Sequence, residues 1–233
     1  MEGFIFDTHI HTKPSSICGR IESEEIVALY KQAGYSGIVI TDHYYNGFFD
    51  GLDGMLENAD KMPWEEKAER FCAGYRAAKA AGDKLGLVVL FGQEMRFLEH
   101  PNDYLAYGIT PEDLVEKPEM YKLTLKEYYP WIHSKGGLLY QAHPFRGERN
   151  APADPRYLDG VEVCNAKPDN ESRNELAQAF CDQNKLMEIS GSDFHKAHHV
   201  GCGGVIFKEC PTTMSEFIDM LRSNAIYGLK RPK

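Results

Sequence analysis

The sequence predicts an α/β protein, a closed or distorted barrel in which strands alternate with helices. Short apolar runs rich in β-branched residues recur along the chain, and amphipathic stretches with helical periodicity separate most of them. No G-x-G-x-x-G motif follows the first apolar run, which argues against a Rossmann sheet. Nearly every apolar run ends in a charged or metal-competent side chain. Strand ends of a parallel barrel carry such residues where they build an active site.

The expected elements follow one another regularly. Strands are expected at residues 4–11, 36–43, 85–95, 102–109, 138–145, 159–166, 186–195 and 203–207. Helices are expected at 23–34, 63–82, from 110, and at 125–137, 170–184 and 213–224. Ser23 fits the N-cap of the first helix, and Gly34 lies just past its end. This alternation indicates parallel βαβ units, and 233 residues suit a single domain over 1–233.

Composition narrows the possible functions. The chain has 26 basic and 35 acidic residues and a net charge of −9, which argues against general binding to nucleic acid or anionic membranes. We see no secretory signal, and no apolar run approaches the ~18 residues of a membrane span. The six cysteines form no C-x-x-C pair. They are expected to be reduced, mostly buried thiols of a cytoplasmic protein.

Two pairs of residues have the spacing of metal ligands. His9 and His11 are two residues apart on an expected strand, so both side chains project to the same face. Asp193 and His195 repeat this geometry near the end of a later strand. Imidazole nitrogen and carboxylate oxygen together suit zinc, iron or manganese.

Other strands end in further candidates. Glu94 has two oxygens and could bridge two metals about 3.5–4 Å apart. His143 precedes Pro144, which ends the strand and holds the histidine at its rim. Asp42 and His43 face opposite ways in a regular strand, so we expect His43 to bind metal and Asp42 to orient it. Each motif alone is a weak signal, but the ordered set indicates one joint site.

The remaining histidines are weaker candidates. His100 follows Glu94 by six residues and is a modest candidate, whereas His133 lies in an expected helix and favours a surface or packing role. His198 and His199 lie in a loop past the strand, where neighbouring side chains diverge. We expect both at the pocket rim or in solvent.

Five motifs in order resemble those of a known family: DTHIHT, ITDH, GQEM, AHPF and GSDFH. From residue 7 to about residue 204, the chain resembles the PHP (polymerase and histidinol phosphatase) superfamily of metal-dependent phosphoesterases. The resemblance implies a distorted (β/α)7 TIM-like barrel with two or three divalent ions (zinc, iron or manganese) at the strand ends. It implies one metal on His9, His11, Glu94 and Asp193, a second on Glu94 and His143, and a third on His43 and His195.

Two positions depart from the family pattern. Many members with three metals carry another histidine shortly after the H-x-H motif. Here Arg20 stands where that histidine could have stood, and its charge is expected to replace the third cation. Many members also place a histidine between the G-x-E and A-H-P motifs. Here Asp103 is nearest to that position and His100 is the alternative.

These observations predict metal-dependent hydrolysis of a small-molecule phosphate monoester by a metal-activated water. Arg146, directly after AHPF, and Arg20 are the expected phosphate clamps because guanidinium matches phosphate geometry. His195 or Asp193 is expected to protonate the leaving alkoxide. The aromatic insert at 44–66 is expected to form a lid or pocket wall.

Two alternatives stay open. A metal-dependent amidohydrolase also uses an H-x-H at the end of its first barrel strand. A catalytically weakened PHP domain would instead bind a phosphorylated ligand or a partner protein. The sequence leaves the substrate, the metals and the oligomeric state open.

Overall fold

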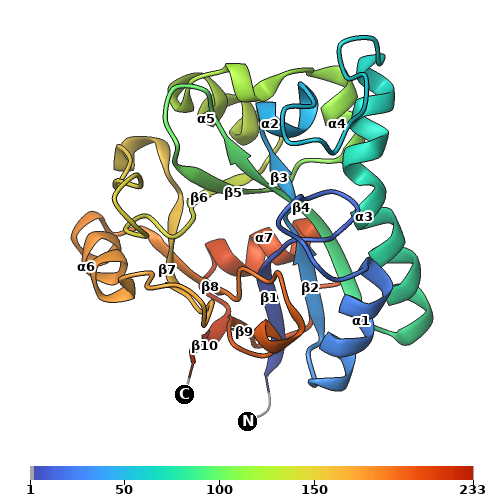
Figure 1. Cartoon of the computed structure of the whole chain (residues 1–233). Helices are drawn as coiled ribbons and strands as arrows, with labels where there is room; N and C mark the ends of the chain where they lie inside the picture. The colour runs from blue at the N-terminus through green and yellow to red at the C-terminus, as the bar shows by residue number, and fades with distance from the viewer. Residues whose placement is uncertain (1–2, 233) are drawn as a thin grey trace.

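The apolar runs of the sequence form the strands of one nearly closed, barrel-shaped sheet (Figure 1). The computed structural model describes residues 3–232. The strands are β1 (Phe4–Ile10), β2 (Gly37–Ile40), β3 (His43–Tyr44), β4 (Val88–Arg96), β5 (Asp103–Tyr107), β6 (Leu138–Gln141), β7 (Gly160–Asn165), β8 (Met187–Gly191), β9 (Gly204–Phe207) and β10 (Ile226–Lys230). Neighbouring strands follow the order β10-β9-β1-β2-β4-β5-β6-β7-β8, and β3 pairs with β4.

The sheet curls until the segment after β8 reaches β1. Phe194 forms a parallel bridge with Ile10. Its backbone N–H donates to the carbonyl of His9 at 3.0 Å, and its carbonyl accepts from the N–H of His11 at 3.0 Å. The predicted distorted TIM-like barrel is therefore confirmed.

Most helices lie around the outside of this sheet, and the last one packs against residues of its interior (Figure 1). The helices are α1 (Ser23–Gln32), α2 (Asn46–Phe49), α3 (Trp64–Leu85), α4 (Pro111–Glu116), α5 (Leu125–Ser134), α6 (Asn174–Asn184) and α7 (Met214–Arg222), with short 3-10 turns η1 (Met120–Lys122), η2 (Pro155–Tyr157) and η3 (Ala197–His199). Capping boxes at Thr110, Thr124 and Thr213 begin α4, α5 and α7. Within residues 3–232, no helix combines the length and apolar character that a membrane crossing requires.

The first helix begins differently from the prediction. Ser23 is its first helical residue, and Glu22 occupies the N-cap position without a side-chain cap. The hydroxyl of Ser23 is buried and has no hydrogen-bond partner among the described residues. The Ser23 N-cap prediction is therefore wrong by one residue, whereas Gly34 has the positive φ of 79° that suits the residue after a helix end.

The sheet is not parallel throughout, contrary to the prediction of parallel βαβ units. Strand β5 runs antiparallel to both β4 and β6, and β9 runs antiparallel to β1. Only residues 97–102 separate β4 from β5, and a parallel crossover needs a dozen or more residues. The reversal brings Asp103, at the start of β5, opposite Arg96, at the end of β4. The two side chains form a bidentate pair with distances of 2.6 and 2.8 Å.

The aromatic insert at 44–66, expected to form a lid or pocket wall, packs mainly as core. Phe48 and Phe49 are buried, and the ring of Phe49 stacks on Trp64 of α3 with 4.7 Å between centroids. The rings of Phe48 and Phe49 also pack against Phe71 of α3. Tyr45 is the part of the insert that reaches the strand ends, with its ring 5.8 Å from that of His43.

The core role of the insert predicts a large loss of stability on truncation. Phe49→Ala should lower the free energy of unfolding by about 3–5 kcal/mol, because it removes a large buried ring and leaves a cavity. Urea unfolding measures this change. Leu52→Ala, in the same insert but 72% exposed, should leave the midpoint nearly unchanged. Equal midpoints for the two variants would contradict the packing described.

Candidate metal centre

Several strand ends bring the predicted ligands into one buried cluster. The cluster contains His9 of β1, His11 directly after β1, His43 of β3, Glu94 of β4, His143 after β6, and Asp193 and His195 after β8. Only His43 among them is half-buried, and the others are buried. The structure therefore unites residues that are up to 186 positions apart (195 − 9) in the sequence.

Lone pairs converge at the centre of this cluster. Nε2 of His9 lies 3.1 Å from Nε2 of His11, and these nitrogens lie 3.3 and 3.2 Å from the two oxygens of Glu94. Oε2 of Glu94 is buried without a well-aligned hydrogen bond among residues 3–232, although Nδ1 of His43 is 2.9 Å away. Nitrogen and oxygen atoms arranged in this way fit a divalent cation such as zinc, iron or manganese.

Glu162 orients His9 from the side away from the cluster. Nδ1 of His9 lies 3.0 Å from Oε1 of Glu162. With the carboxylate oxygen as acceptor, Nδ1 is the nitrogen that donates. In the neutral ring, the lone pair of Nε2 therefore faces Glu94. Carboxylates commonly support metal-binding histidines in this way.

The charges in the cluster also favour a cation. Burial opposes the charged form of His9, but the carboxylates of Glu94 and Glu162 raise its pKa well above the usual value. Burial would raise the pKa of Asp193, but His9 and His11 hold it well below its usual range. The pKa of Glu94 is likewise held well below its usual value by His43 and His9 despite burial, so these two carboxylates are ionised. A metal would replace protons on the histidines, so metal binding should release protons.

His143 is held in a strained conformation beside Glu94. Its φ is 29°, a region that non-glycine residues seldom adopt. Its backbone N–H donates to Oε2 of Glu162 at 3.1 Å, and its Nε2 lies 3.0 Å from Oε1 of Glu94. Arg146 donates to the same Nε2 at 2.9 Å, so that nitrogen presents a lone pair. Asp193 also has a positive φ, of 47°, and such strain is often retained at functional sites.

Asp103, not His100, lies beside this second position. His43, Glu94 and Asp103 each place a ligand atom within 4.8 Å of the others. The antiparallel β5 brings Asp103 there. His100 is exposed, and its Nδ1 accepts from the backbone N–H of Asn102 at 3.2 Å.

The thiol of Cys18 occupies the position where we expected the guanidinium of Arg20. The ligand atoms within 4.8 Å of one another belong to His11, Cys18, His43 and His195. Burial would raise the pKa of the Cys18 thiol, but His11 and His43 lower it to about 4. The side chain of Arg20 is exposed, and only its backbone N–H is seen to reach the cluster, donating to the carbonyl of His195 at 3.1 Å.

Two cationic side chains lie on one side of Asp193. The guanidinium of Arg146 donates to Oδ2 of Asp193, and Nζ of Lys167 lies 3.4 Å from the same oxygen. Nζ of Lys167 also lies 3.1 Å from Nδ1 of His195. The side chain of Arg146 is 23% exposed and that of Lys167 is 13% exposed, so both border solvent as well as the cluster.

His199 is buried, contrary to its expected place at the rim. Its Nδ1 accepts from the backbone N–H of His195 at 3.1 Å. In the neutral ring, Nε2 therefore carries the proton and donates to Asp169 at 3.2 Å. Neither nitrogen is free for a metal, so the group formed by Asp169, His198 and His199 anchors a loop. His198 is exposed, as predicted.

Three residues of this centre were assigned no role from the sequence. Glu162 lies within β7, and its distance from the H-x-H motif along the chain gave no sign of a contact with His9. Lys167 follows the end of β7 by two residues, and a position just past a strand end was the available signal. Cys18 follows His11 by seven residues, but a single cysteine in a loop carries no spacing signal.

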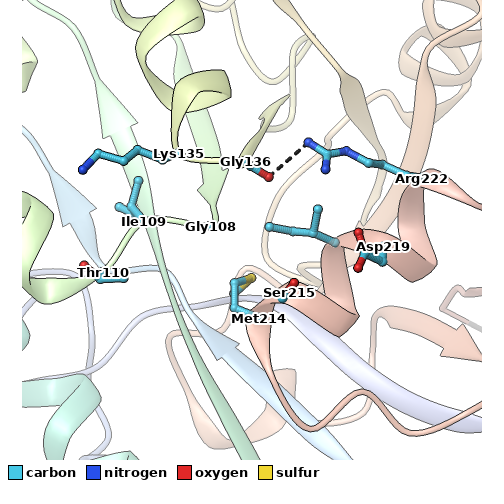
Figure 2. Close-up of a pocket in the computed structure, with 10 residues that line it drawn as sticks. Gly108, Ile109, Thr110, Lys135, Gly136, Met214, Ser215, Asp219 and Arg222 are labelled. Atoms are coloured by element: carbon cyan, nitrogen blue, oxygen red, sulfur yellow. Dashed lines mark hydrogen bonds between the residues drawn. The ribbon is translucent and has the colours of Figure 1, made fainter.

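A pocket of about 330 Å3 lies at the opposite end of the barrel (Figure 2). It lies past the carboxyl end of β5 and before β6, and α7 forms its other wall. Arg222 there donates to the carbonyls of Gly136 and Gly137, and Lys135 pairs with Asp113. None of the metal-competent groups found within residues 3–232 includes a residue of this pocket.

Comparison with known proteins gives one family match and several structural ones. Residues 171–226 match the family model described as PHP-associated. No curated protein matches the chain significantly. PsfC from Pseudomonas syringae PB-5123 has a similar structure, with 17% identity and a TM-score of 0.65 over 94% of this chain and 88% of that one.

Two other proteins of similar structure are named for different activities. A two-domain protein from Bacteroides vulgatus ATCC 8482, containing a predicted PHP-like metal-dependent phosphoesterase, gives 16% identity and a TM-score of 0.68 over 96% of this chain and 63% of that one. An amidohydrolase from Chromobacterium violaceum gives 16% identity and a TM-score of 0.55 over 98% of both chains. Residues 171–226 therefore resemble the PHP-associated family, and the solved structures show that the barrel fold is shared.

The contact between His9 and Glu162 predicts the effect of one isosteric substitution. Glu162→Gln should weaken metal affinity about 10–100-fold, because losing a supporting carboxylate costs roughly this much at comparable sites. Competition with a chelator measures the affinity. Glu188→Gln on β8, whose carboxylate accepts from Gln178, is the matched control. Equal affinities for the two variants would show that Glu162 does not support a ligand.

Proposed function

We propose that the protein is a metal-dependent phosphatase that hydrolyses a small-molecule phosphate monoester. The observation that carries this proposal is the position of two cations beside a cluster of metal-competent lone pairs. Arg146 and Lys167 both contact Asp193, which also lies 3.4 Å from Nε2 of His11. An anion bound there would face metal ions on one side and two cationic side chains on the other.

Bound metal ions would lower the pKa of a coordinated water towards neutrality and offset charge on the phosphoryl oxygens. The residues that would hold them are His9, His11, His43, Glu94, Asp103, His143, Asp193 and His195. Burial of these side chains keeps competing water away from the ligand atoms. The low effective dielectric of such a site also strengthens the interaction of each charge with the substrate.

Arg146 and Lys167 would bind the phosphate of the substrate. The planar guanidinium of Arg146 can donate two parallel hydrogen bonds to phosphoryl oxygens, and the ammonium of Lys167 adds a point charge. Both cations contact Asp193. Charge that develops on the phosphoryl oxygens in the transition state would therefore meet preorganised donors. Arg20 is exposed and fits a clamp less well than Lys167.

Asp193 and His195 fit the role of ligands better than that of proton donors. The pKa of Asp193 lies well below its usual range, with burial opposed by His9 and His11. Nδ1 of His195 lies 2.6 Å from the carbonyl of Asp193, which leaves Nε2 with a lone pair in the neutral ring. Neither side chain then carries a spare proton at neutral pH, so the leaving alkoxide would take its proton from water.

An amidohydrolase is the second candidate, because a protein of that name shares the fold. The two cations beside Asp193 favour a doubly charged phosphate over a neutral amide. Assays of amide and lactone substrates beside p-nitrophenyl phosphate separate the two chemistries. A weakened domain that only binds a phosphorylated ligand would bind it without turnover in the same assay.

Metal dependence gives the broadest prediction of this proposal. The purified protein should contain zinc, iron or manganese, and chelation should abolish p-nitrophenyl phosphate hydrolysis until divalent metal is restored. His9→Ala should lose both metal and activity, since the ring contributes a buried lone pair to the cluster. His133→Ala, which removes a surface contact with Asp159, should keep both. Activity that persists after chelation would contradict the proposal.

The phosphate clamp is tested separately by Arg146→Ala. We expect kcat/KM for phosphate esters to fall about 100-fold, the scale seen when one preorganised donor is removed from an active site. Steady-state kinetics with metal analysis measures the effect. Arg149→Ala, three residues away and exposed, should behave like the unmodified protein. Loss of metal from the Arg146 variant would instead assign the arginine a structural role.

A further inference from the structure

Cys18 differs from the other cysteines in what surrounds its thiol. Cys72, Cys164 and Cys181 belong to the buried apolar core. The Cys18 thiol instead lies within 4.8 Å of a ring nitrogen of His43 and of His195. It is partly exposed, so it borders both the cluster and solvent. Sulfur and two imidazole nitrogens therefore face one point beside the centre already described.

The loop that carries Cys18 is fixed in place. Asp42 accepts hydrogen bonds from the backbone N–H of Thr12 and from the hydroxyl of Ser16, both at 2.7 Å. The N–H of Gly19 donates to the carbonyl of Ser16 at 2.9 Å. A Cβ at Gly19 would lie 2.5 Å from the carbonyl oxygen of Thr12, so only glycine fits beside Cys18. The turn therefore holds the thiol rather than leaving it on a mobile loop.

The same loop is bonded to the backbones of both histidines. Ser16 Oγ accepts from the backbone N–H of His43 at 3.0 Å. On the other side of Cys18, the N–H of Arg20 donates to the carbonyl of His195 at 3.1 Å. These two hydrogen bonds fix the separation of the thiol from the two rings. Such preorganisation is what a metal site requires from its supporting residues.

We propose that Cys18 binds a thiophilic divalent ion as a thiolate, together with His43 and His195. The inference rests on the metal centre of the proposed function but does not depend on the phosphate substrate. Thiolate and imidazole ligands suit zinc, whereas manganese and magnesium prefer oxygen. The ion at Cys18 is therefore zinc or a metal of similar ligand preference.

On this proposal, the two metal positions differ in the types of ligand that they offer. The position next to His9, His11 and Glu94 offers only nitrogen and oxygen ligands, so it accepts zinc, iron or manganese. The position at Cys18 adds a sulfur ligand and therefore favours zinc over manganese more strongly. A thiol-modifying reagent should displace the ion at Cys18 while the ligands of the other position keep theirs.

Cobalt provides a direct test, because a thiolate bound to Co(II) gives a near-ultraviolet charge-transfer band that nitrogen and oxygen ligands do not. The metal-free protein is titrated with Co(II), and the band and the bound cobalt are measured together. The unmodified protein should show the band. Cys18→Ser should lose the band and a single equivalent of cobalt, while its circular dichroism stays unchanged. Cys202→Ser should match the unmodified protein.

Two further measurements guard against indirect effects. Cys18→His should restore the lost equivalent without the band, because imidazole replaces the thiolate as a ligand. Alkylation of Cys18, followed by mass spectrometry of its peptide, should slow when zinc is present, whereas alkylation of Cys202 should not. Loss of the cobalt equivalent in Cys18→His, or an alkylation rate at Cys18 that ignores zinc, would contradict ligation by sulfur.

The outcomes separate this inference from the proposed function. Cobalt that binds without a charge-transfer band, or a band that survives in Cys18→Ser, overturns the role of Cys18 and leaves the phosphatase proposal standing. A protein that binds no cobalt at all overturns the metal centre and with it both proposals. Neither conclusion requires a measurement of phosphatase activity.

Discussion

The structure depends on two buried carboxylates that need a cation beside them. Glu94 and Asp193 lie among imidazoles at the strand ends, out of contact with bulk water. Burying an ionised carboxylate costs several kcal/mol unless opposite charge and hydrogen bonds compensate. Neighbouring carboxylates outweigh burial and raise the pKa of His9, and Arg146 pairs with Asp193. Both observations show positive charge compensating the buried carboxylates. A divalent ion would meet this need most fully, so the charge of the cluster favours a metal ion.

Most of the fold could be predicted from local patterns, and its exceptions have local or long-range causes. The short apolar runs marked the strands of the barrel, because a sheet buried on both faces requires such runs. The direction of β5 was missed, although the short connection over 97–102 excluded a parallel crossover. The burial of Phe49 could not be read from the insert, since its partners Trp64 and Phe71 lie in a helix that packs there only in the folded chain.

Site residues were predictable where the geometry of a strand sets the direction of their side chains. They were less predictable where a loop sets that direction. His9 on β1 and His11 directly after it are two residues apart in extended backbone and so share a face, and the sequence alone implied this. Cys18 reaches the cluster through a turn held by Asp42, and no periodicity describes such a turn. Glu162 contacts His9 across the barrel, a pairing that depends on how the sheet closes. Sequence patterns therefore indicated candidate ligands on strands and just past their ends, but not Glu162 or Cys18.

A crystal structure of the protein grown with zinc and inorganic phosphate tests the central claim most directly. Anomalous scattering at the zinc edge should show ions bound by His9, His11 and Glu94, with Asp193 in contact. Phosphate density should lie between these ions and Arg146. Absence of anomalous peaks there, with the same side chains hydrogen-bonded to one another, would contradict a metal centre and the phosphatase chemistry built on it.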